Sequence, residues 1–152
     1  MDEDKIYMRR AVRLAGRSRG LVSPGALVGA VIVHKGTIVG EAAYKSLGGP
    51  HAETEAIAAA GERCRGSTLY VSLEPCAHYG STPPCADAII SAGIRRVVCA
   101  LEDPDKRVCG KGFRQLRKAG VLVEVGLLAD EAERGNAAFL THRRTGKPLV
   151  IL

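Results

Sequence analysis

The sequence predicts an α/β protein in which a mixed five-stranded sheet lies between two layers of helices, a three-layer α/β/α sandwich. Two observations lead to this prediction. Two apolar runs, ALVGAVIV and TIVGEAAY, are separated by His34-Lys35-Gly36, which is the pattern of an antiparallel hairpin. From Ser67 onwards short apolar runs alternate with helical segments, which indicates parallel strands joined by covering helices.

Each expected strand is a short apolar run bounded by turn residues. The first run is almost continuously apolar, so we expect that strand to lie in the interior of the sheet. The later runs STLYVSL, RRVVCAL and VLVEVG have the length and composition of buried strands. We therefore expect strands over residues 26–33, 37–44, 67–73, 95–101 and 121–126.

The expected helices are marked by their ends. HAETEAIAAAG combines the helix propensity of Ala and Glu with Gly61 as a stop signal, PPCADAIISAG opens with proline, and KGFRQLRKAG closes with glycine. The N-terminal segment follows helical periodicity imperfectly, and LADEAERGNAAFLTHRR is expected to form one last helix. We therefore expect helices over residues 3–18, 51–61, 83–93, 111–120 and 128–144.

The length and composition predict one globular domain over residues 1–152. Apolar residues make up 46% of the 152 residues and charged residues 25%, without an internal repeat or a linker. No apolar run approaches the roughly 20 residues that cross a bilayer, and MDEDKIYMRR lacks the apolar centre of a secretory signal. We expect a cytoplasmic protein. The ending TGKPLVIL indicates a further strand or the lead into another domain.

The net charge of +6 favours partners that carry phosphate. The basic stretches RRAVRLAGRSRG and THRRTGK contain no interleaved aromatic residues, so they predict a solvated basic face. We expect no nucleic-acid groove.

The five cysteines form an odd set in a chain without a secretory signal, which argues against a disulfide framework. Cys99 lies in the apolar run RRVVCAL and is expected in the core. Cys64 and Cys109 lie in polar stretches and are expected to be incidental thiols. Cys76 and Cys85 remain, at the ends of PCAHYGSTPPC.

His51, Cys76 and Cys85 have the pattern of a metal site. His51 and Cys85 are expected at helix N-termini, and Cys76 at the end of the strand between them. The partial positive charge of a helix N-terminus lowers the pKa of a thiol and favours the thiolate that binds metal. Two thiolates and one imidazole suit Zn²⁺, and three protein ligands leave the fourth position open, as in catalytic sites.

Glu53, two residues after His51, is the expected proton-transfer residue. Zinc lowers the pKa of a bound water towards about 7, and a nearby carboxylate can pass the water's proton to a substrate nitrogen. Zinc deaminases carry His-x-Glu followed by Pro-Cys-x-x-Cys. Here His51-Ala52-Glu53 and Pro75-Cys76 match, but eight residues separate the cysteines. For His78 and Tyr79, between the cysteines, a place at the mouth of the pocket and a role in packing the loop are about equally favoured.

The chain resembles the pyrimidine deaminase domain of the bifunctional riboflavin-biosynthesis deaminase/reductase, in the cytidine deaminase-like superfamily. The resemblance spans the whole chain and rests on VGAVIV, GGPHAE, LYVSLEPCAHYGSTPPCADAIISAGIRRVV, GKGFRQLRKAGV and VGLLADEAERGNAAFL. It implies the deaminase fold, His51, Cys76 and Cys85 as zinc ligands, and Glu53 as the proton shuttle. It also implies a reaction in which the exocyclic amine of a diaminopyrimidinone ribosylamine phosphate becomes a carbonyl with release of ammonia.

Four positions on the expected substrate side depart from the family pattern. Gly25 stands where relatives have an asparagine that contacts substrate, and Tyr44 stands where a histidine is common. Ser81 replaces a basic or imidazole residue before Thr-Pro-Pro-Cys, and Asp105 replaces an asparagine. Asp103, which the resemblance places beside the substrate, is kept. These changes remove hydrogen bonds and a phosphate partner.

The sequence leaves several functions open. A deaminase of the riboflavin precursor and a deaminase re-tuned to another aminated heterocycle or nucleoside are about equally favoured. A nucleic-acid editing deaminase is disfavoured. The non-enzymatic alternative is a module in which zinc only stabilises the fold. By resemblance we expect a homodimer or homotetramer. No reductase domain is expected within residues 1–152, so the reductase could be a separate partner.

Overall fold

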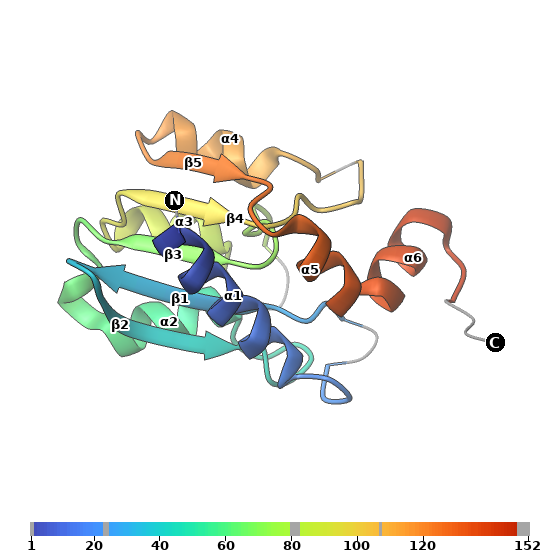
Figure 1. Ribbon diagram of the computed structural model, residues 1–152. Coiled ribbons are helices and arrows are strands. Elements are labelled where there is room, and N and C mark those ends of the chain that lie inside the picture. The colour runs from blue at the N-terminus through green and yellow to red at the C-terminus, as the bar shows by residue number, and fades with distance from the viewer. Residues whose placement is uncertain (1, 23–24, 80–82, 107, 149–152) are drawn as a thin grey trace.

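The computed structural model describes residues 2–22, 25–79, 83–106 and 108–148 (Figure 1). Its strands form one mixed sheet in the order β2-β1-β3-β4-β5. β1 (Gly29–His34) pairs antiparallel with β2 (Thr37–Ala43) and with β3 (Thr68–Val71). β3, β4 (Arg96–Cys99) and β5 (Leu122–Val125) run parallel. The predicted fold class, the hairpin and the interior position of the first strand are confirmed.

Helices cover both faces of the sheet and complete the three layers. In Figure 1, α1 and α5 lie in front of the sheet, and α2, α3 and α4 lie behind it. The 3₁₀ turn η1 (Gly61–Cys64) follows α2 directly. The α-helices are α1 (Asp2–Gly16), α2 (Ala52–Ala60), α3 (Cys85–Ser91), α4 (Lys111–Lys118), α5 (Ala129–Gly135) and α6 (Ala137–Thr145).

The sheet separates two apolar cores, because successive side chains of a strand point to opposite faces. Ile32 and Val97 pack with α2, α3 and α4, and their neighbours Val31 and Val98 pack with α1, α5 and α6. All four side chains are fully buried or nearly so. β1, β2, β3 and β4 therefore contribute to both cores, whereas β5 contributes only Val123, to the core under α2, α3 and α4.

Two glycines bring helices into direct contact with the hairpin. A Cβ on Gly29 would lie 1.9 Å from the Ala11 carbonyl oxygen, and one on Gly40 would lie 2.3 Å from the Ala56 carbonyl oxygen. Any larger residue would therefore push α1 or α2 off the sheet. The contact at Gly40 sets how closely α2 packs on the sheet, and it therefore sets the positions of His51 and Glu53.

The prediction of one helix over residues 128–144 is wrong. α5 and α6 are separate helices, and Asn136 lies between them. Asn136 has φ −112° and ψ 20°, outside the helical range. Its buried amide accepts a hydrogen bond from the Leu27 N–H at 2.7 Å and donates one to the Leu27 carbonyl at 2.8 Å. These two bonds tie the break to the segment that leads into β1.

Of the three cysteines outside the expected metal site, one lies in a different environment from the one predicted. Cys99 is fully buried in the core, as expected. Cys64 is also fully buried, because η1 turns its side chain onto the core below α2, so its description as an incidental thiol is wrong. Cys109 is half-buried and its thiol donates to the Glu102 carboxylate. None of the five forms a disulfide.

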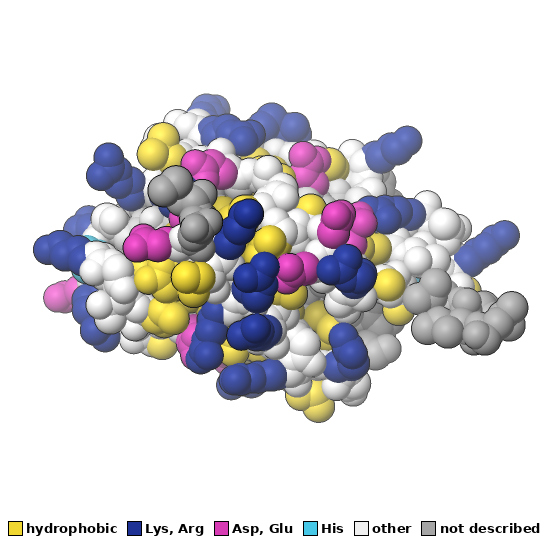
Figure 2. Space-filling model, in the orientation of Figure 1, with side chains coloured by type: hydrophobic (Ala, Val, Ile, Leu, Met, Phe, Trp, Pro, Cys, Tyr) yellow, Lys and Arg dark blue, Asp and Glu magenta, His cyan; other side chains and the backbone are white. Residues whose placement is uncertain are grey.

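The surface carries mixed charge. Figure 2 shows Lys and Arg side chains spread over one face with Asp and Glu between them. Within the described ranges, no helix has both the length and the apolar character needed to span a bilayer. Of the expected final segment, Thr145 ends α6, and residues 149–152 lie outside the described part of the chain.

We expect Asn136→Ala to lower the free energy of unfolding by about 2–3 kcal/mol, because it leaves the N–H and C=O of Leu27 without partners. This corresponds to a fall in Tm of roughly 5–10 °C for a chain of this size. Thermal denaturation followed by circular dichroism measures it. His142→Ala, on the exposed side of α6, is the control and should change Tm by less than about 2 °C. Equal Tm values for the two variants would contradict this role of Asn136.

Candidate active site

The side chains of His51, Cys76 and Cys85 meet where two helices begin. His51 is the N-cap of α2, with extended backbone at φ −74° and ψ 158°. Cys85 is the first residue of α3, directly after Pro84, as predicted. Cys76 was expected at the end of a strand, but it lies in the loop five residues beyond the last residue of β3. The loop turns back towards α3, so that the backbone N–H of Ala86 donates to the Cys76 carbonyl at 3.0 Å.

The spacing of the three ligand atoms fits zinc. His51 Nδ1 lies 3.1 Å from Cys85 Sγ and 3.7 Å from Cys76 Sγ, and all three atoms lie within 4.8 Å of one another. Tetrahedral zinc, with bonds of about 2.0 Å to nitrogen and 2.3 Å to sulfur, separates N and S by about 3.6 Å. No fourth His, Cys, Asp or Glu from the described residues joins the cluster. The set therefore matches a site with one open position.

The environment of the sulfurs favours a thiolate. The Cys85 backbone N–H donates to Cys76 Sγ at 3.2 Å, as expected at the start of a helix. Hydrogen bonding from the Cys85 side chain, together with the His51 contact, lowers the pKa of Cys76 to about 4. The same contact with Cys76, together with burial, raises the pKa of Cys85. The pKa of His51 is raised, chiefly by its hydrogen bond to Cys76. The three groups are thus coupled, and metal binding to the cluster would displace the protons that they carry.

Glu53 is the second residue of α2, beside the ligand cluster, and is only 3% exposed. Its Oε1 has no hydrogen-bond partner among the described residues. Burial raises its pKa to about 7, against the opposing effects of its own backbone N–H and of His51. A buried carboxylate with an unpartnered oxygen is costly unless a ligand satisfies it. Glu53 is therefore placed to take up and release a proton near neutral pH.

A cavity of about 240 Å³ opens over Glu53 and the ligand cluster. Tyr44, His78 and Asp103, three of the residues expected on the substrate side, line it. Tyr44 meets the His51 ring edge-on, with ring centroids 5.4 Å apart, and its hydroxyl accepts a hydrogen bond from Gly48 N–H at 2.8 Å. Tyr44 therefore supports the imidazole. The other lining residues are Ala26, Val28, His51, Glu53, Leu73, Glu74, Cys76, Phe139 and Arg143.

Asp103 and Arg143 form an ion pair on the wall of this cavity. The Arg143 Nε and Nη2 donate to the two carboxylate oxygens of Asp103, each at 3.3 Å. The same guanidinium lies 4.0 Å from the Asp105 carboxylate and 5.6 Å above the centre of the Phe139 ring. Arg143 belongs to THRRTGK, which was expected to be a solvated basic stretch. The fold of α6 instead turns this arginine onto the cavity.

The remaining expected substrate residues do not line the cavity or lie outside the described residues. Gly25 precedes the lining residue Ala26, and a Cβ on it would lie 2.8 Å from the Val22 carbonyl oxygen and 3.7 Å from the Tyr44 ring. Asp105 lies beside Arg143 at the rim and donates its N–H to Asp103 at 2.9 Å. Ser81 lies outside the described part of the chain.

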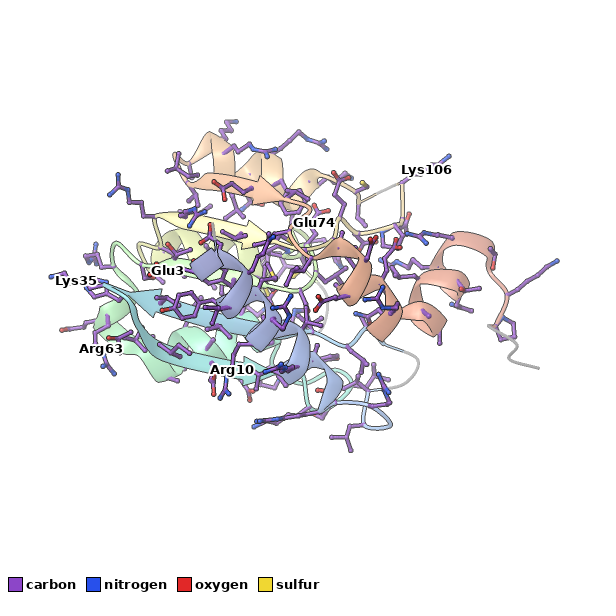
Figure 3. The ribbon with its side chains drawn as sticks, viewed as in Figure 1. Glu3, Arg10, Lys35, Arg63, Glu74 and Lys106 are labelled. Carbon is purple, nitrogen blue, oxygen red and sulfur yellow. The ribbon has the colours of Figure 1, made fainter. Side chains whose placement is uncertain are left out.

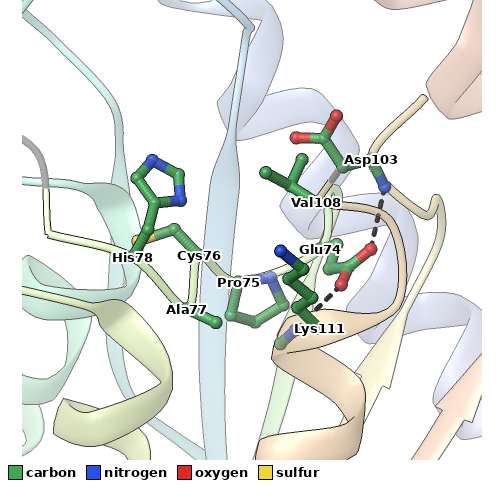
Figure 4. Close-up of a pocket in the computed structure, with 9 residues that line it drawn as sticks. Glu74, Pro75, Cys76, Ala77, His78, Asp103, Val108 and Lys111 are labelled. Atoms are coloured by element: carbon green, nitrogen blue, oxygen red, sulfur yellow. Dashed lines mark hydrogen bonds between the residues drawn. The ribbon is translucent and has the colours of Figure 1, made fainter. Parts of the chain in front are cut away.

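A second compartment of about 160 Å³ adjoins the first (Figure 4). The two share Glu74, Cys76, His78 and Asp103. Glu74 lines both compartments and is 8% exposed; Figure 3 labels it in the interior of the molecule and Lys106 at the periphery. Its Oε1 accepts hydrogen bonds from Asp103 N–H at 3.0 Å and Gly110 N–H at 3.1 Å, and its Oε2 accepts one from Gly112 N–H at 3.1 Å.

Sequence reasoning did not single out Glu74, Lys111 or Arg143. Glu74 adjoins Pro75-Cys76, and an acidic residue in an otherwise apolar strand end is a signal that it satisfies buried donors. No comparable pattern indicates Lys111 or Arg143, because the sequence of a basic stretch does not show which of its side chains faces a cavity and which faces solvent. Arg143 takes its role from Asp103, 40 residues away in sequence, and Lys111 takes its role from a compartment that it lines together with Glu74, Cys76 and His78.

Comparisons with known proteins agree with this geometry. Residues 1–101 match the cytidine and deoxycytidylate deaminase zinc-binding region. The riboflavin biosynthesis protein RibD of Escherichia coli is 49% identical over 150 residues, which is 99% of this chain and 41% of that protein. The chain thus spans about two fifths of the length of that relative. The diaminohydroxyphosphoribosylamino-pyrimidine deaminase of Buchnera aphidicola is 46% identical over 146 residues, 96% of this chain and 99% of that protein.

The fold is also that of a solved relative. The structure of Acinetobacter baumannii RibD superposes with a TM-score of 0.95 at 44% identity and covers 97% of this chain and 41% of that one. The prediction of family and fold is confirmed, including the zinc-binding character of the domain. The chain therefore belongs to the cytidine and deoxycytidylate deaminase family, among the deaminases of riboflavin biosynthesis.

Proposed function

We propose that this chain catalyses the zinc-dependent hydrolytic deamination of a diaminopyrimidine that carries a phosphoribosylamino group. The exocyclic amine becomes a carbonyl and ammonia is released. The observation that supports this most directly is the unpartnered carboxylate oxygen of Glu53, buried in a cavity beside a His-Cys-Cys cluster. The substrate class rests on the name of the Buchnera relative, of which this chain covers 99%.

In this proposal His51, Cys76 and Cys85 hold zinc, which when bound lowers the pKa of a water molecule towards about 7 and makes it a nucleophile. Glu53 accepts the proton of that water on Oε1 and delivers it to the leaving nitrogen. Water supplies the oxygen of the new carbonyl, the C–N bond breaks, and the amine departs as ammonia. A Glu53 pKa near 7 suits both proton uptake and proton release.

We assign substrate contacts to Asp103, Tyr44 and His78, which line the cavity. The carboxylate of Asp103 can accept hydrogen bonds from N–H or O–H groups of the substrate, and Arg143 orients it through two hydrogen bonds. Tyr44 contributes its ring to the cavity wall, and its hydroxyl, which accepts a bond from the Gly48 N–H, keeps an O–H that can donate to a ligand. Gly25, Ser81 and Asp105 are assigned a part in substrate selection, since they replace the residues common in relatives.

The second candidate is deamination of a different aminated heterocycle or nucleoside. It is favoured by those same replacements at Gly25, Tyr44, Ser81 and Asp105, beside an unchanged metal cluster and Glu53. A non-catalytic module stapled by zinc is less favoured, because a structural site is closed by a fourth protein ligand and needs no adjacent carboxylate. The described residues offer no such ligand.

We also propose that residues 1–152 act as one deaminase domain in the cytoplasm, with the reductase activity supplied by a separate domain or protein. Five unpaired thiols are typical of a reducing compartment. A solved structure from Thermotoga maritima is named as a deaminase and reductase, and this chain covers 43% of it, so the link to a reductase is drawn from that relative.

We expect purified protein to contain about one zinc ion per chain, and Cys85→Ser to lose most of it, because a hydroxyl is a poor replacement for a thiolate ligand. Metal analysis by atomic emission measures the ratio. Cys109→Ser is the matched control, since its thiol contacts only the exposed Glu102 carboxylate, and it should keep its zinc. Full zinc occupancy in Cys85→Ser would exclude this ligand set.

The wild-type protein should release ammonia from the phosphoribosylamino diaminopyrimidine, and Glu53→Gln should lower kcat by roughly 10²- to 10⁴-fold with zinc retained. The amide keeps the size of Glu53 but cannot take up the proton. Coupled ammonia detection measures the rate, and Glu55→Gln, on the same helix, is the control. Faster turnover of another aminopyrimidine, an aminopurine or a nucleoside would favour the second candidate. Unchanged activity in Glu53→Gln would exclude the mechanism.

We propose that the chain assembles as a homodimer or homotetramer. The outer strand β5 exposes Leu122 and Val125, and large apolar side chains are also exposed at Ile6 and Leu21. Apolar side chains on an unpaired strand edge favour contact with a second chain. Light scattering after size exclusion should give two or four times the mass of one chain, whereas the mass of one chain would contradict assembly.

A further inference from the structure

The compartment next to the active-site cavity is placed to receive a second part of the substrate. It shares Glu74, Cys76, His78 and Asp103 with the cavity over Glu53. A ring bound beside Glu53 can therefore extend a substituent into it without leaving the cavity. The residues that line only this second compartment are Pro75, Ala77, Val108, Lys111 and Gly112.

Of the described residues that line either compartment, Arg143 and Lys111 are the permanent cations. Arg143 is already compensated, because Asp103 accepts two hydrogen bonds from it and Asp105 lies 4.0 Å away. A dianion next to Arg143 would face these two carboxylates and be repelled. Lys111 forms no ion pair with any described residue. Its charge is therefore open to an anion from solution.

Glu74 fixes the backbone on both sides of Lys111. The N–H of Gly110 donates to one of its oxygens and the N–H of Gly112 to the other. Gly112 also packs directly on the segment before Cys76, since a Cβ on it would lie 2.0 Å from the Pro75 carbonyl oxygen. Lys111 is thus anchored to the same segment that carries a metal ligand. Glu74 accepts three hydrogen bonds from backbone N–H groups and forms no ion pair with Lys111 among the described contacts.

Figure 4 shows the amino end of Lys111 inside the compartment, with Cys76 and His78 on one side and Val108 and Glu74 on the other. We infer that Lys111 binds the phosphate group of the substrate and is the residue that selects for a phosphorylated ligand. This inference rests on the proposed function and adds the site of the phosphate to it. A lysine ammonium is a compact charge that suits a phosphate with rotational freedom at the end of a ribose.

The test compares two substrates on two variants. On the phosphoribosylamino diaminopyrimidine, Lys111→Met should lower kcat/KM by about 10- to 100-fold, mostly through KM, as expected for the loss of one charge-assisted contact. On the dephosphorylated ribosylamino compound the same variant should match the wild type within about twofold. Lys111→Arg should recover most of the lost kcat/KM, because it restores the charge. Lys118→Met, which removes the same charge at the far end of α4, should behave as wild type on both substrates.

Several outcomes overturn the inference. An equal loss on both substrates would mean that Lys111 only supports the loop, and an absence of loss on either would mean that the phosphate lies elsewhere. If the wild type deaminates neither compound, the proposed function fails, and titration with ribose 5-phosphate decides about Lys111 separately. Binding that Lys111→Met abolishes would support the phosphate site, and equal binding to both proteins, or none to either, would exclude it.

Discussion

The three ligand side chains come together because α2 and α3 begin at the same end of the sheet and pack beside one another. Gly40 allows α2 to approach β2 closely, and the parallel crossover from β3 to β4 places α3 on the same face. The loop after β3 then passes between the two helix starts with Cys76 at its turn. Everything that the site does depends on this convergence, since neither helix carries more than one ligand.

The burial that creates the cores also sets the chemistry. Glu53 lies on the buried face of α2, where water is excluded, and this raises the pKa of its carboxyl to about 7. The exclusion of water also disfavours any further charged group, yet the cluster of His51, Cys76 and Cys85 lies directly beside Glu53. The free energy of burying these polar groups is offset when a metal ion binds the cluster. Metal binding at this cluster would therefore both stabilise the fold and supply the chemistry of the site.

A second organising group lies on the substrate side. Glu74 uses one carboxylate to hold three backbone N–H groups from a loop that contains Asp103 at one end and Lys111 at the other. Arg143 reaches the same loop from α6 and pairs with Asp103. The loop therefore presents an acceptor, Asp103, to both compartments and a cation, Lys111, to the second alone. In the proposed function the ring lies over Glu53 and the phosphate lies at the cation.

The sequence by itself determined the features that depend on local pattern. Hydrophobic runs, proline starts and glycine stops predicted every strand and the first four helices, and His51-Ala52-Glu53 with the two cysteines predicted the metal cluster. Residue type carries this information because zinc accepts few kinds of ligand. All the substrate-side assignments remain predictions, namely those to Gly25, Tyr44, His78, Ser81, Asp103 and Asp105.

Only the tertiary structure decided the features that depend on distant partners. The break at Asn136 exists because its amide bonds Leu27, 109 residues away in sequence. Cys64 is a core residue because η1 turns inwards, although its neighbours are polar. Arg143 faces the cavity because α6 packs beside the segment before β1. A helical or basic pattern gives the spacing of side chains, but which of them finds a partner is set by the packing of elements far apart in the chain.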